Sequence, residues 1–82
     1  MKRVVYLAAA LKALRKHRSD AARIDEKIRL YAAEPAALAN NVKQLAGSEE
    51  KRLRVGDYRV IFLETEDEII VSRIGPRGSV YD

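Results

Sequence analysis

The sequence contains no cysteine and only one histidine, His17. Without cysteine the chain can form neither disulfides nor thiolate metal sites, and a single histidine argues against a clustered zinc site. We therefore expect no metal and no cofactor. With 82 residues the chain has room for one modest hydrophobic core, whose stability must come from helix–sheet packing.

Long apolar runs are also missing. No segment approaches the roughly 18 apolar residues that a membrane-spanning helix requires. The N-terminal stretch MKRVVYLAAALKALRK starts basic and has a short apolar run, but charge returns at Lys12 and no small-residue cleavage site follows. We expect a cytoplasmic protein that does not act at a membrane.

Residues 1–82 show no repeats and no Gly/Ser-rich linker, so a single domain is expected. The N-terminal half is helical in pattern, after a short strand expected over residues 3–7. Apolar side chains then recur at helical spacing in two stripes, Leu7, Leu11 and Leu14, followed by Ala21, Ile24, Ile28 and Tyr31. Ser19 is the expected N-cap of the second helix, with Asp20 near the positive end of its dipole, and Pro35 ends that helix by residue 33 or 34. Residues 36–45 fit either another helix or a break.

The C-terminal half changes to a period of two. Strands are expected over residues 51–55, 58–64 and 69–74, with turns at Gly56-Asp57 and at residues 65–68, a loop at 75–78, and a short final strand or tail at 79–82. In the first of these strands Leu53 and Val55 point one way and Arg52 and Arg54 the other. The expected fold class is α+β, with a helical hairpin packed on one face of an antiparallel sheet and the other face open.

Positive charge gathers in this half of the chain. The net charge is +4, which suggests a polyanionic partner. The C-terminal half contains six cations, and because neighbouring strands lie side by side we expect several of them to converge on one patch: Lys51, Arg52, Arg54, Arg59, Arg73 and Arg77. Arginine suits a phosphate-binding surface because its planar fork grips two oxygens and stays charged. In the alternative interpretation these side chains extend into solvent or pair with Glu64, Glu66 and Asp67.

Such a patch contains no histidine and no Ser/His/Asp arrangement. Arginine, lysine, glutamate and tyrosine are still sufficient to cleave RNA, because the ribose 2′-OH is a built-in nucleophile and cations can stabilise the charged phosphorane. Without a good general base, such an enzyme would depend on something else to hold its substrate in the reactive geometry.

The segments KRLRVGDYRVIF and IIVSRIGPRGSVY resemble the RelE/ParE superfamily of toxins from bacterial toxin–antitoxin modules, and the resemblance covers nearly the whole chain. It implies a RelE-like microbial RNase-type fold. For the RelE branch it also implies ribosome-dependent cleavage of mRNA in the A site, by 2′-OH attack that leaves a 2′,3′-cyclic phosphate. The implied partners are a cognate antitoxin, the ribosome with its mRNA, and operator DNA only through the antitoxin.

The resemblance also assigns roles to residues. Arg59 would contact the scissile phosphate, Arg77 would support the phosphate oxygens, and Arg52 would stabilise the transition state. Tyr81 would stack on the A-site nucleotide or take a proton from it. Lys51, Arg54 and Arg73 would bind RNA or the ribosome. Where some RelE-type members carry a lysine, this chain has Glu50, which is either a substitute base or a solvated acid.

Two other functions remain open. ParE-type members share the fold but poison DNA gyrase without cutting RNA, and a third possibility is a non-catalytic basic module that binds RNA or its antitoxin. Tyr58 and Phe62 are expected in the core and Tyr31 on the packed face of its helix, while His17 is expected at a helix end, in contact with the dipole and solvent.

Overall fold

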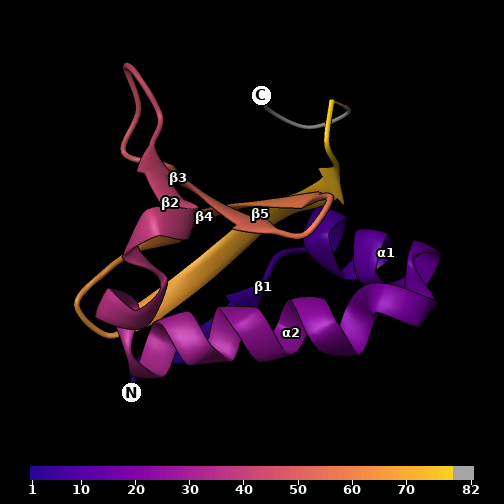
Figure 1. Ribbon diagram of the computed structural model, residues 1–82, viewed down its shortest axis with the longest axis horizontal. Helices are drawn as coiled ribbons and strands as arrows, with labels where there is room; N and C mark the ends of the chain where they lie inside the picture. Colours follow the sequence, from indigo (N-terminus) through magenta and orange to yellow (C-terminus); the bar gives the residue numbers. More distant parts are fainter. Residues whose placement is uncertain (79–82) are drawn as a thin grey trace.

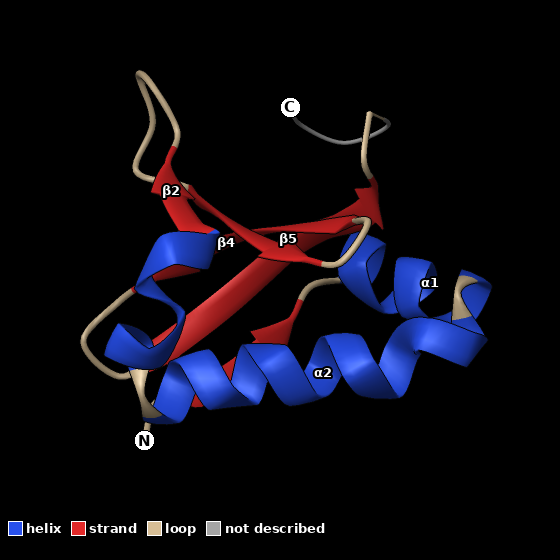
Figure 2. Ribbon diagram, viewed as in Figure 1, coloured by secondary structure: helices blue, strands red, loops and turns tan. Residues whose placement is uncertain are grey.

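The computed structural model describes residues 1–78. A helical hairpin lies against one face of a sheet, as Figures 1 and 2 show. This arrangement confirms the expected α+β class. In chain order the elements are β1 (Arg3–Tyr6), α1 (Ala8–Lys16), α2 (Arg18–Ala33), the 3-10 segment η1 (Pro35–Asn41), β2 (Val42–Gln44), β3 (Lys51–Val55), β4 (Tyr58–Glu64) and β5 (Glu68–Pro76).

The described part of the chain forms a five-stranded sheet in the order β1-β5-β4-β3-β2. Strands β2 to β5 pair antiparallel, which confirms the expected meander of β3, β4 and β5. Strand β1 pairs parallel with β5, with Arg3 opposite Glu68, so the sheet is mixed. Parallel pairing is possible here because the long connection through both helices lets the chain cross over the sheet.

The ambiguous segment 36–45 is neither a regular helix nor a simple break. It starts as η1 and continues as β2, which places Val42 opposite Leu53 and Lys43 opposite Arg52. Leu38, which precedes β2 in the sequence, and Leu45, which follows it, are both buried. Strand β5 is longer than expected and includes Gly75 and Pro76, which had been assigned to a loop. The final strand or tail expected at 79–82 lies outside the described residues.

The apolar stripe predicted for α1 is confirmed only at Leu14. Leu7 and Leu11 are 45% and 40% exposed, whereas Ala10 is fully buried and Ala13 and Leu14 pack against the core. The residues turned inward are thus mostly alanines, whose small side chains let α1 lie close to the sheet. In α2 the prediction holds, because Ile24, Ile28 and Tyr31 are buried.

The boundary between the helices is also corrected. His17 is the one residue between α1 and α2, and it serves as C-cap of the first and N-cap of the second. Ser19 therefore lies inside α2 and is not its cap. The backbone N–H of Asp20 donates to the carbonyl of His17 at 3.0 Å, which closes the first turn and places the carboxylate where the helix dipole favours it.

The core lies between the helices and the sheet. Leu53, Val60, Phe62 and Val71 face α2 from three neighbouring strands and are at most 1% exposed. Because side chains alternate along a strand, this packing turns their chain neighbours to the opposite face of the sheet. Of the helices in the described part of the chain, none is long and apolar enough to cross a membrane.

Candidate nucleic-acid interface

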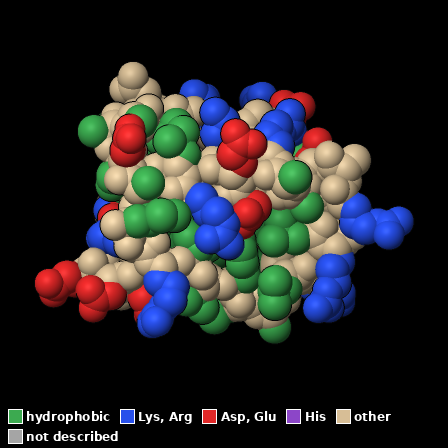
Figure 3. Space-filling view, turned by 90° about the horizontal axis from the view of Figure 1, so that it is seen from below, with side chains coloured by type: hydrophobic (Ala, Val, Ile, Leu, Met, Phe, Trp, Pro, Cys, Tyr) green, Lys and Arg blue, Asp and Glu red, His purple; other side chains and the backbone are tan. Residues whose placement is uncertain are grey.

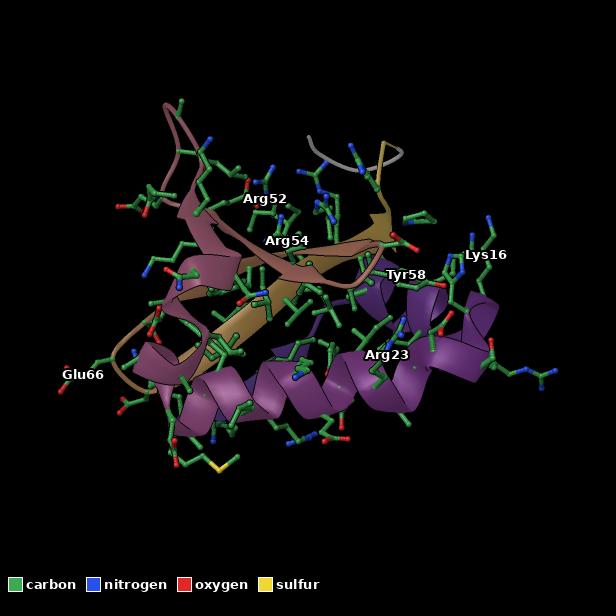
Figure 4. All side chains as sticks on the ribbon, viewed as in Figure 1. Lys16, Arg23, Arg52, Arg54, Tyr58 and Glu66 are labelled. Carbon is green, nitrogen blue, oxygen red and sulfur yellow. The ribbon has the colours of Figure 1, made fainter. Side chains whose placement is uncertain are left out.

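The face of the sheet opposite the helices carries two rows of basic side chains. In one row Arg54 on β3 lies directly opposite Arg59 on β4, which lies opposite Gly75 on β5. In the next row Lys43, Arg52, Ile61 and Arg73 follow one another across four strands. Figure 4 shows Arg52 and Arg54 on the side of the sheet away from α2. We call Lys43, Arg52, Arg54, Arg59 and Arg73 the basic face.

Arg59 lies at the centre of the basic face and is only 7% exposed. Its Nη1 donates to the carbonyl oxygens of Tyr58 at 3.2 Å and Gly56 at 3.5 Å. The side chain is thus held in place by the backbone of its own hairpin. Because directly opposed residues of an antiparallel pair have Cβ atoms about 5 Å apart, Arg54 and Arg59 bring two like charges together, which is normally destabilising.

Arg77 follows β5 and extends the basic face at one end. Its backbone N–H donates to the carbonyl of Asp57 at 2.7 Å, so it lies beside the β3–β4 turn. In that turn Gly56 has φ +57° and no non-glycine residue in the described chain has a positive φ. This is the geometry of a type II′ turn, which requires glycine at the first central position and explains the Gly-Asp order.

Lys51 does not join the arginines. It lies on the helix side of the sheet, where its Nζ contacts Glu64 Oε1 at 2.9 Å. Lys2 Nζ donates to the other carboxylate oxygen at 2.8 Å, and the Tyr31 hydroxyl donates to Oε1 at 2.6 Å. Partial burial alone would raise the pKa of Glu64, but the three hydrogen bonds outweigh it and lower the pKa to about 2. Burial and this same carboxylate raise the pKa of Tyr31.

Glu50 is the acidic residue next to the basic face. It precedes β3 and shares the side of Arg52, two residues further along the strand. The Ser72 hydroxyl donates to Glu50 Oε2 at 3.3 Å and to the carbonyl of Ile61 at 3.2 Å. Ser72 is available for this contact because a β-bulge interrupts the pairing of β4 and β5 at Ile61 and Phe62.

Tyr58 contacts the helices instead of the basic face. Its hydroxyl donates to Asp20 Oδ2 at 2.6 Å, an interaction that raises its pKa, and its ring packs edge-on against His17 at 5.2 Å. Tyr58 is half-buried at the rim of the core, whereas Phe62 is fully in the core as expected. Tyr81 lies outside the described residues.

Two of the acids expected to pair with the arginines lie elsewhere. Glu64 is occupied by Lys2 and Lys51, and Glu66 lies at the far end of the sheet, at the β4–β5 turn (Figure 4). Arg52, Arg54 and Arg77 form no ion pair within residues 1–78. On the helix side, by contrast, acidic and basic side chains are intermixed with apolar patches (Figure 3).

The side chains of the basic face are carried by rigid strands and can bind phosphate groups. Among residues 1–78 no group of three or more His, Cys, Asp or Glu side chains is placed to hold a metal ion. The sequence had indicated Arg52, Arg54, Arg59 and Arg73, and the structure brings these four together. Lys43 was missed because residues 36–45 also fit a helix, so β2, the strand that carries Lys43, was not predicted.

A comparison with family models matches residues 4–81 to the ParE toxin of the type II toxin–antitoxin system parDE. The chain belongs to the ParE toxin family. The predicted membership of the RelE/ParE superfamily is thereby confirmed. No curated protein matches the toxin sequence.

Solved structures agree with this family. A chain of the archaeal RelE–RelB complex from Pyrococcus horikoshii OT3 is 28% identical, with a TM-score of 0.76 over 96% of the toxin and 98% of that chain. YafQ from E. coli strain BL21(DE3) has 16% identity and a TM-score of 0.76, covering 100% of both chains. A copper-bound mutant toxin from Helicobacter pylori has 16% identity and a TM-score of 0.80, covering 99% of this chain and 100% of that one. The last two similarities show the fold alone.

Proposed function

We propose that this toxin is a ribosome-dependent endoribonuclease that cleaves mRNA in the A site. The observation that carries the proposal is the opposed pair Arg54 and Arg59, with Arg52 and Arg73 in the adjacent row. A row of arginines on a rigid sheet can neutralise several phosphates of one nucleic-acid backbone at once. The likeness to the archaeal RelE–RelB complex adds support.

In the proposed step the ribose 2′-oxygen attacks the adjacent phosphorus, and the bond from phosphorus to the 5′-oxygen breaks. The products are a 2′,3′-cyclic phosphate and a 5′-hydroxyl, which takes up a proton. Arg77 binds the phosphate oxygens, and Arg59 joins it once its side chain turns out of its contacts with Tyr58 and Gly56. Arg52 stabilises the extra negative charge of the phosphorane, while Arg54 and Arg73 bind flanking RNA or the ribosome. Lys51, which is engaged by Glu64, has no part in this step.

The 2′ proton needs an acceptor, and the chain offers two. Glu50 is held beside Arg52 by Ser72, and Tyr81 is the acceptor that the superfamily resemblance implies. Glu50→Gln separates them, because it keeps the shape of the side chain and removes the base. A loss of about 10²-fold or more in cleavage rate would assign the role to Glu50, and an unchanged rate would leave it to Tyr81.

The decisive experiment is primer extension on a defined mRNA, incubated with the toxin with and without programmed 70S ribosomes. Arg77→Ala is the informative variant, because Arg77 is exposed and its loss leaves the core intact. Removing one positioned charge-stabilising group typically costs 10²–10³-fold, so cuts within A-site codons should become about 100-fold slower. Arg18→Ala, on the helix side, is the matched control and should cut normally. Intact mRNA under all conditions would contradict the proposal.

The matched ParE family model favours a second candidate, a toxin that inhibits DNA gyrase without cutting RNA. A supercoiling assay with purified gyrase tests it. Inhibition by wild type and by Arg77→Ala alike, together with intact mRNA in the ribosome assay, would establish this candidate in place of the nuclease.

For either target we propose a cognate antitoxin as the partner in the cell. Solved relatives form RelE–RelB and DinJ–YafQ toxin–antitoxin complexes. Any contact with operator DNA would be made through that antitoxin. Co-expression with the neighbouring gene product and purification of a stable complex tests this partner.

A further inference from the structure

A groove lies around the end of β5, on the side of α1. It has a volume of about 250 Å³, and Lys12, Lys16 and His17 are its polar lining residues. The rest of its lining consists mostly of small or flat residues, including Ala13, Gly75 and Pro76. Lys12 and Lys16 are four residues apart in α1, so both side chains stand on the same side of the helix.

The charge of this groove is of one sign. None of its lining residues is acidic, and neither lysine forms an ion pair within the described chain. Like charges four residues apart weaken a helix slightly, whereas Lys16, in the last turn, is favoured by the dipole of α1. A concave surface lined by one sign of charge concentrates the electrostatic field and attracts the opposite sign.

The groove and the basic face share the end of one strand. Gly75 lines the groove and is also the residue opposite Arg59, and Pro76 lines the groove and directly precedes Arg77. Figure 4 shows Lys16 at the side of the molecule where β5 also ends. Basic side chains therefore follow one another from Arg54 past Arg77 to Lys16 and Lys12, although Asp57 lies beside Arg77 and Asp20 beside His17. An extended basic surface of this kind fits a long polyanion better than a single small anion.

We propose that the α1–β5 groove binds the phosphate backbone of RNA, beside the nucleotide whose phosphate lies on the basic face. This assignment rests on the proposed function, because it takes RNA as the substrate. The two lysines neutralise phosphates, and the small lining residues let the ribose–phosphate chain approach the protein backbone. An acidic protein segment is the other chemistry that the charge would accept, and the test separates the two.

The test measures binding and not cleavage. The probe is a short fluorescent RNA with 2′-O-methyl groups, which cannot react, titrated with the purified toxin at increasing salt. Each lost phosphate contact lowers the slope of log K against log salt by about 0.7 on a single strand, so Lys12→Gln/Lys16→Gln should lower it by about 1.4 and weaken binding about tenfold at low salt. Arg18→Gln/Lys27→Gln removes the same net charge from α2 and should leave the slope unchanged.

Equal slopes for the two double variants would overturn the inference. A second result would also overturn it: if Lys12→Gln/Lys16→Gln reduces the affinity for a poly-glutamate peptide more than the affinity for RNA, the groove is a peptide site. If the groove variant lowers the slope but the ribosome assay shows no cleavage, only the nuclease proposal fails. If cleavage occurs and the slopes match, only the groove assignment fails.

Discussion

Arg54 and Arg59 oppose each other across neighbouring strands, a placement of like charges that is normally destabilising. Replacing Arg54 by threonine removes the repulsion and introduces a good strand former, so the free energy of unfolding should rise by about 0.5 kcal/mol. RNA binding should weaken in the same variant. Urea unfolding and anisotropy titration on one preparation measure both effects. A fall in stability would show that Arg54 contributes to the fold in a way that the register does not reveal.

Adjacent cations can have unrelated roles, as Lys51 and Arg52 do. Lys51 contacts Glu64 on the helix side, whereas Arg52 lies on the basic face. The period of two already separates them in the sequence, so this difference was predictable once the strand was assigned. The partner of Lys51 was not predictable, because Glu64 comes from another strand and Lys2 from the other end of the sequence.

At the scale of elements, the β3–β4 turn fixes the position of Arg59. Gly56 has φ +57°, and a Cβ added there would lie 3.5 Å from the Arg23 side chain, which is ordinary contact. The cost of Gly56→Ala is therefore backbone strain, about 1–2 kcal/mol. Gly56→Asn should lose clearly less, because asparagine tolerates a positive φ. Equal losses in thermal unfolding would mean that the turn does not keep this conformation.

The hydrophobic spacing of the sequence predicted the elements that short-range contacts determine. Strand β3 alternates clearly, β4 and β5 are apolar runs of strand length, and short turns join the three, so both their existence and their pairing followed from the sequence. β2 was missed because Leu38, Val42 and Leu45 also fit a helical period. The inward face of α1 was predicted wrongly because leucine is more hydrophobic than alanine, so the pattern pointed to Leu7 and Leu11. In the structure α1 packs so closely against β5 that the small side chain of Ala10 is the one buried there.

At the scale of the molecule, Glu64 connects four segments through Lys2, Tyr31 and Lys51. Its pKa of about 2 in the fold lies below the ordinary value. The carboxylate therefore stabilises the fold above its unfolded pKa, by at most about 3 kcal/mol, and this contribution is lost as the pH falls through the folded value. Glu64→Gln should be less stable at neutral pH and lose less stability on acidification. Glu66→Gln, at an exposed turn, should behave as wild type; identical acid profiles for both variants would contradict the assignment.

The parallel pairing of β1 with β5 also bears on the synthesis of the protein. Residues 3–6 pair with residues 68–71, so the edge of the sheet cannot close until nearly all of the described chain exists. Contacts between such distant segments are formed late and slowly in folding. A nascent chain that still lacks β5 thus has an incomplete sheet, in which β1 is unpaired. Completion of the sheet, and with it any toxic activity, therefore waits until residues 68–71 have been synthesised.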